Sequence, residues 1–212
     1  MTKIGDIILW VPGTNNHSRP QAFVRAAKQP VQLVDYEASW RFSSSLVDGY
    51  DRLVEALLAA QRKRKPGQRI LLAGESQGAL LISKVLMNPR YAAVVDKAVL
   101  LGHPGISPIH YKYPDAGVLE INHVLDPATF HWTDHPTALI EAIDKISRLN
   151  LKSFSTLPIF ARVFLDHPFE SVWAGVLALG HLHPLSRLIP NPHDYSRNMA
   201  QAARWLVSTE AP

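Results

Sequence analysis

Residues 69–80 have the sequence Arg-Ile-Leu-Leu-Ala-Gly-Glu-Ser-Gln-Gly-Ala-Leu, and this stretch decides the fold class. Its apolar first half predicts a buried strand, and the residues from Gln77 onward predict a helix that follows almost without a linker. Between the two lies G-x-S-x-G with Ser76 at its centre. In this context the motif predicts a nucleophile elbow, which exposes the serine hydroxyl at a helix N-terminus. Ser76 is therefore the predicted nucleophile, and the alternative is a glycine-rich turn with a serine helix cap.

The segments around this motif alternate between strand and helix patterns. Apolar runs predict strands over 7–11, 31–36, 69–73, 97–101 and 117–123, and helical spacing predicts helices over 46–62, 77–87 and 195–207. This alternation predicts an α/β protein with a central parallel sheet of about five strands and helices on both faces. Together with the elbow motif it indicates an α/β-hydrolase. Right-handed crossovers would bring the carboxyl ends of the strands, and any ligand site, to one edge of the sheet.

The region from 134 to 188 shows only helical patterns, over 137–148, 157–165 and 169–179. Several of these segments are apolar on more than one side. One interpretation is ordinary helix packing against the sheet; the other is a small helical cap that offers an apolar surface to an acyl chain. We predict a single domain over 1–212, with 134–188 as a cap or insertion between the catalytic Asp and His.

A serine at its free pKa is a weak nucleophile and needs a carboxylate and a base, which follow it in this fold in the order Asp, His. Asp126 lies just past the strand predicted over 117–123 and is the predicted carboxylate. Its alternative role is an ordinary Asp-Pro turn. Asp115 precedes that strand, and Asp134 is better placed as a helix cap.

The predicted base is His193, on a proline-rich loop before the last helix, where Asp194 can cap that helix. His181 and His183 are nearby rivals. Their His-x-His spacing can suggest a metal, but no third ligand is evident, so we expect no metal site.

An oxyanion hole needs two backbone N–H groups aimed at the charge that develops during attack. Gln77, the residue after the nucleophile, is predicted to supply one. Thr14, in the loop that follows the first strand, is predicted to supply the other. The alternative for residues 12–15 is a simple turn.

Composition limits the remaining classes of function. The chain has 212 residues, a formal net charge of +4 and no cysteine, which excludes disulfides, thiolate metal sites and cysteine nucleophiles. We find no nucleic-acid motif, no stretch long enough to span a bilayer and no export signal at the start, so we expect synthesis in the cytoplasm without a signal peptide. The basic run over 62–65 is interpreted as a solvated helix end, or alternatively as a wall- or lipid-binding patch.

These motifs resemble those of the cutinase-like serine hydrolases, and within them the lysin B esterases of mycobacteriophages. The resemblance rests on Gly13-Thr14, the elbow over 74–79, Gly-x-Pro over 102–104, the late Asp126 and Pro-His-x-Tyr over 192–195. The elbow of the family usually has an aromatic residue at the position of Glu75.

The resemblance implies an esterase that needs neither metal nor cofactor and acts on a lipid or cell-envelope ester. Lysin B esterases cleave the ester between mycolic acids and arabinogalactan, at the host envelope after lysis begins. Cutinases proper are secreted and carry disulfides, so a cysteine-free chain is more similar to the phage enzymes. Because lysin B enzymes often have a longer insertion between Asp and His, the cap here is expected to be reduced.

Two alternatives remain at this stage. One is a general cutinase-type lipase or short-chain esterase, which a small closed pocket would favour. The other is a non-catalytic binding module on a hydrolase fold, against which the presence of all three triad residues in the right order argues. No sequence feature indicates an oligomeric state.

Overall fold

The computed structural model of the chain describes residues 5–39, 41–104, 117–122 and 194–209. Within them, five strands form one sheet in the order β2-β1-β3-β4-β5, and all neighbouring pairs are parallel. The strands are β1 (Ile7–Val11), β2 (Val31–Leu33), β3 (Ile70–Glu75), β4 (Lys97–Leu101) and β5 (Gly117–Ile121). This confirms the predicted parallel α/β sheet.

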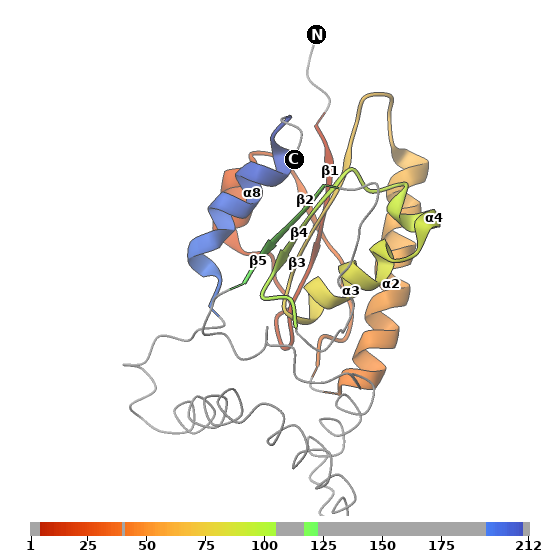
Figure 1. The fold of residues 1–212 in the computed structure, drawn as a ribbon, viewed down its shortest axis with the longest axis vertical. Helices are drawn as coiled ribbons and strands as arrows, with labels where there is room; N and C mark the ends of the chain where they lie inside the picture. Colours follow the sequence, from red (N-terminus) through yellow and green to blue (C-terminus); the bar gives the residue numbers. More distant parts are fainter. Residues whose placement is uncertain (1–4, 40, 105–116, 123–193, 210–212) are drawn as a thin grey trace, which may run out of the picture.

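Helices cover both faces of the sheet (Figure 1). One face carries α1 (Gln21–Ala27) and α8 (Met199–Val207), which pack together; a short 3-10 turn, η4 (Ser196–Asn198), leads into α8. The other face carries α2 (Phe42–Lys63), α3 (Gln77–Leu86) and the short α4 (Pro89–Ala92). No helix among the described residues is long and apolar enough to cross a membrane.

Burial on both faces explains why the central strands are apolar throughout. Along β3, Ile70 and Leu72 join the core cluster formed with α2 and α3. Leu71 and Ala73 join the second cluster, formed with α1 and α8. The sheet is therefore the middle layer of three, and the turn after β3 lies at its carboxyl edge.

Most predicted elements are confirmed, with changed bounds. The strand predicted over 31–36 ends at Leu33. Val34, Tyr36 and Ala38 are still buried at alternate positions after the strand ends. The alternating burial therefore extends further along the chain than the strand pairing with β1. The helix predicted from residue 46 begins at Phe42, and the strand predicted to residue 123 ends at Ile121. The predicted cap over 134–188 lies outside the described residues.

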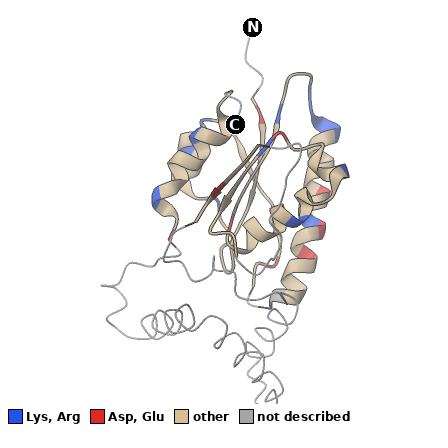
Figure 2. Ribbon diagram, viewed as in Figure 1, with Lys and Arg blue, Asp and Glu red and all other residues tan. Residues whose placement is uncertain are grey.

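The basic run over 62–65 lies at the C-terminal end of α2, where the ribbon in Figure 2 has the blue of lysine and arginine. Arg64 is held there, with Nη2 3.2 Å from Asp96 Oδ1 and Nε donating to the carbonyl of Gln68 at 2.6 Å. Because α2 leads into β3, this end of the helix lies at the amino ends of the strands. The run is therefore at the opposite edge of the sheet from the turn that carries Ser76.

Candidate active site at the carboxyl edge of the sheet

Ser76 is the single residue between β3 and α3, and its backbone is strained. Its φ of 52° and ψ of −118° lie where side-chain-bearing residues are rarely found. Its N–H donates to the carbonyl of Leu101, at the end of the neighbouring strand β4, over 2.8 Å. The partly exposed hydroxyl makes no cap bond to α3, so the alternative role of a serine helix cap does not describe this turn.

Close backbone contacts explain the glycines around Ser76. A Cβ on Gly74 would lie 2.8 Å from the carbonyl carbon of Gly78, and a Cβ on Gly78 would lie 2.1 Å from the carbonyl oxygen of Val11. A Cβ on Gly13 would lie 3.2 Å from the Cβ of Ser76. Strand β3, helix α3 and the loop after β1 therefore meet at contact distances that admit no side chain.

The two predicted oxyanion donors lie beside this turn. Gln77 is the first residue of α3, where N–H groups have no partner within the helix. Thr14 follows Gly13, whose position against Ser76 brings the loop to the nucleophile. Within the part of the chain that the structure describes, neither the Thr14 nor the Gln77 N–H donates a hydrogen bond to the protein.

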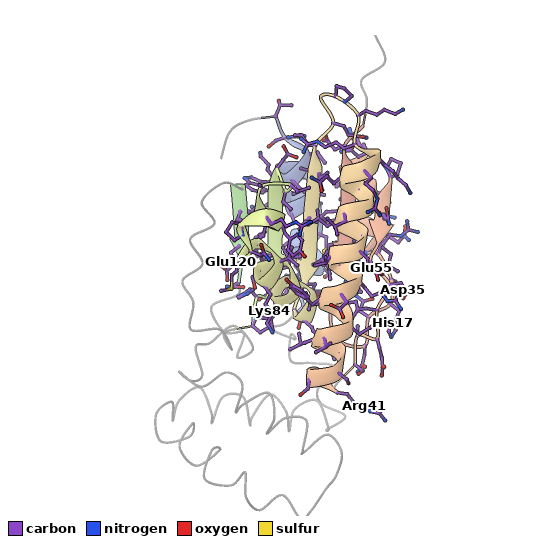
Figure 3. All side chains as sticks on the ribbon, turned by 90° about the vertical axis from the view of Figure 1, so that its right-hand side faces the viewer. His17, Asp35, Arg41, Glu55, Lys84 and Glu120 are labelled. Carbon is purple, nitrogen blue, oxygen red and sulfur yellow. The ribbon has the colours of Figure 1, made fainter. Side chains whose placement is uncertain are left out.

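A second serine, histidine and carboxylate lie close together in the structure. They are far apart in the sequence, and no motif predicted the contact. His103 Nε2 lies 2.9 Å from Ser83 Oγ, and His103 Nδ1 lies 3.6 Å from Glu120 Oε1. Glu120 is labelled in Figure 3 and comes from the edge strand β5. Ser83, however, is fully buried in the middle of α3 and donates its hydroxyl proton to the carbonyl of Leu80 at 2.8 Å. N–H groups in the middle of a helix bond within that helix, so α3 offers Ser83 no free N–H groups of the kind that an oxyanion hole needs.

The predicted triad partners Asp126 and His193 lie outside the described residues, as do their rivals, Asp115, Asp134, His181 and His183. The described chain resumes directly after His193. There, Asp194 Oδ1 accepts a hydrogen bond from the N–H of Ser196 at 2.9 Å, and Tyr195 is fully buried among the residues of the α1–α8 face. The segment that follows His193 is therefore anchored to the sheet. No group of three or more metal-ligating side chains occurs among the described residues.

Comparison with solved structures identifies the fold. Lysin B from Mycobacteriophage D29 is similar with a TM-score of 0.53 at 15% identity, over 98% of this chain and 92% of that one. A cutinase-like protein from Cryptococcus sp. gives 0.41 at 18% identity, over 49% of this chain and only 55% of its own. An acetylxylan esterase gives 0.45 at 14% identity, over 72% of this chain and 96% of its own. The sequence matches no protein-family model and no curated protein.

The chain therefore has an α/β-hydrolase fold similar to that of lysin B. This conclusion rests on the parallel sheet described above and on the similarity to lysin B, which extends over nearly the whole chain.

Proposed function

We propose that this chain is a serine esterase that hydrolyses lipid acyl esters. Ser76 is the nucleophile, His193 the general base and Asp126 the carboxylate that orients the histidine. The backbone N–H groups of Gln77 and Thr14 form the oxyanion hole. The observation that carries the proposal is the strained conformation of Ser76 between β3 and α3, with a hydroxyl that makes no cap hydrogen bond to α3.

Strain at this position needs a reason, because a residue with this φ costs about 1–3 kcal/mol. A structural turn would avoid the cost with glycine, as at Gly67, which has a φ of 77°. A serine here instead presents its hydroxyl beside the N-terminus of α3, where free N–H groups favour negative charge. Strain of this kind typically marks a functional site.

The proposed reaction follows from these roles. The Ser76 oxygen attacks the ester carbonyl carbon while His193 takes the hydroxyl proton, and the carbonyl electron pair moves to the oxygen facing Gln77 and Thr14. Collapse of this tetrahedral intermediate breaks the bond to the alcohol, which receives the proton from His193. Water then attacks the acyl-enzyme with the same base, which releases the carboxylic acid and restores Ser76.

For the substrate we propose a long acyl ester of a cell envelope, including mycolyl-arabinogalactan esters cleaved during phage lysis. The similarity to lysin B over almost the whole chain supports this class. The apolar helical patterns between residues 134 and 188 support an acyl-binding surface. In this role the protein would act at the host envelope after lysis begins.

The proposal is tested with p-nitrophenyl butyrate and palmitate as substrates for the wild type, Ser76→Ala and Ser83→Ala. Ser76→Ala should abolish turnover, and its thermal melting should stay close to that of the wild type. Ser83→Ala removes a buried hydroxyl from α3, the helix that follows Ser76, and should retain turnover. Wild-type turnover by Ser76→Ala would refute the proposal, and so would an inactive, folded wild type.

A further inference from the structure

A buried polar cluster lies behind the candidate oxyanion hole and joins three separate parts of the chain. Its members are Tyr36 from the segment after β2, Ser45 from the first turn of α2, and the side chain of Gln77 from α3. They are 4%, 1% and 0% exposed, respectively. Buried polar groups are costly unless they are hydrogen-bonded, so such a cluster needs a purpose.

Each hydroxyl of this cluster holds a backbone carbonyl. Tyr36 Oη donates to the carbonyl of Pro12 over 2.7 Å, and Ser45 Oγ donates to the carbonyl of Glu37 over 2.5 Å. Each hydroxyl has a single proton, which goes to its carbonyl, so the side-chain amide of Gln77, 3.4 Å from Tyr36 Oη and 3.2 Å from Ser45 Oγ, can bond to these two oxygens only through its NH2 group. Burial, together with the negative charge of Asp48, raises the pKa of Tyr36. Its hydroxyl therefore keeps its proton and remains a donor throughout the working pH range.

The Pro12 carbonyl matters because it begins the loop that carries Thr14. In a trans peptide the C=O and N–H point in opposite directions. Fixing the carbonyl of Pro12 therefore fixes the N–H of Gly13 and the direction in which the loop leaves β1. One residue further, the carbonyl of Gly13 accepts from the N–H of Asn16 at 3.0 Å, which sets the plane of the peptide carrying the Thr14 N–H.

The loop is held on its far side as well. The N–H of Asn15 donates to the carbonyl of Ala38 over 2.6 Å, so this N–H is unavailable to a substrate. Ala38 lies two residues beyond Tyr36, and the N–H of Ser39 donates to Ser45 Oγ at 3.2 Å. The segment over 36–39 is thus a brace between the oxyanion loop and α2.

We infer that Tyr36 is a positioning residue for catalysis, and that its hydroxyl couples the two oxyanion donors. The Tyr36 hydroxyl holds the loop of Thr14 through the Pro12 carbonyl. It also contacts the side chain of Gln77, and the backbone N–H of Gln77 is the other proposed donor. The inference rests on the proposed function and assigns the cluster to the stabilisation of the tetrahedral intermediate. The hydroxyl touches neither the substrate nor the reacting atoms.

The first test is Tyr36→Phe, which removes one oxygen and keeps the ring in the core. Misaligned donors weaken an interaction made mainly in the transition state, so kcat on p-nitrophenyl butyrate should fall at least about 10-fold, with KM changed less than about 2-fold. The rate of Ser76 phosphonylation by a p-nitrophenyl phosphonate should fall in parallel, because that adduct places an oxygen in the same hole.

Tyr91→Phe is the matched control, because Tyr91 packs against the same core cluster but lies at α4. It makes the same chemical change outside the polar cluster and should leave both rates unchanged. If Tyr36→Phe does not fold, Ser45→Ala should show the same loss of kcat without a change in KM. Parallel behaviour of Tyr36→Phe and Tyr91→Phe would overturn the inference, as would a change in KM alone. A wild type that is not phosphonylated at Ser76 would instead refute the proposed function.

Discussion

At the level of single residues, the strained backbone of Ser76 is the feature that favours a catalytic role over that of a structural turn. The φ of 52° is held by the hydrogen bond to Leu101 and by contacts at Gly74 and Gly78 that exclude side chains. Ser76→Gly should relieve the strain that Ser76→Ala retains. Its free energy of unfolding should therefore be about 1 kcal/mol higher than that of Ser76→Ala. Chemical denaturation of the two inactive variants measures this difference. Equal stability would show that the turn stores no strain.

The proposed triad partners can be tested at this level. If Ser76, Asp126 and His193 act as one unit, as we propose, His193→Ala and Asp126→Asn should each lower kcat on the order of 10⁴-fold. His181→Ala and His183→Ala should change kcat only a few-fold. For the wild type, kcat/KM should rise with pH through one ionisation, since the base must be neutral. A collapse of kcat in His181→Ala or His183→Ala, with His193→Ala active, would reassign the base and leave Ser76 in place.

At the level of elements, what could be predicted follows from the strength of each local pattern. The elbow was predicted because β3 and α3 adjoin it and its glycines are fixed by backbone contacts. Helix α1 was not predicted, since it has only seven residues and Phe23 is its one large buried side chain, with Ala27 the other buried residue. The pair of His103 and Ser83 was missed as well. It forms between α3 and the end of β4, and no local spacing encodes such a contact.

The end of α8 gives a prediction for stability at this scale. Arg69 donates to the carbonyls of Val207 and Ser208 and pairs with Asp6 at 2.6 Å. Burial alone would raise the pKa of Asp6, but the hydrogen bond and charge of Arg69 outweigh it and hold the pKa below 3.8. A lowered folded pKa gives stability that is present above pH 3.8 and lost as the pH falls through the folded value.

Asp6→Asn should therefore lower the unfolding free energy by about 1–2 kcal/mol at pH 7, and the difference from the wild type should shrink under acidic conditions. Urea unfolding across the pH range measures it. Asp51→Asn, at an exposed position on α2, serves as the control and should have little effect. If the unfolding free energy of Asp6→Asn stays below that of the wild type by the same amount well below pH 3.8, the ion pair does not have this role.

At the level of the whole molecule, the sheet and its helices hold the turn at Ser76, and we propose that the segment over 134–188 determines the substrate. If its apolar faces bind an acyl chain, polar replacements of Phe164 or Trp173 should harm palmitate ester hydrolysis more than butyrate hydrolysis. The reason is that remote contacts contribute binding energy that is used in the transition state. Initial rates on the two esters, compared with thermal melting, test this. Equal losses on both would point to destabilisation instead.

The central claim is that Ser76 is the nucleophile of a serine esterase, and covalent labelling tests it most directly. The intact protein is incubated with a p-nitrophenyl phosphonate, which loses p-nitrophenol as a serine oxygen bonds to phosphorus; the protein is then digested and mapped by mass spectrometry. We predict one adduct per chain, on the peptide that contains Ser76, with loss of esterase activity in proportion to labelling. An adduct on Ser83 or any other residue, or full labelling of Ser76 with activity retained, would contradict the claim.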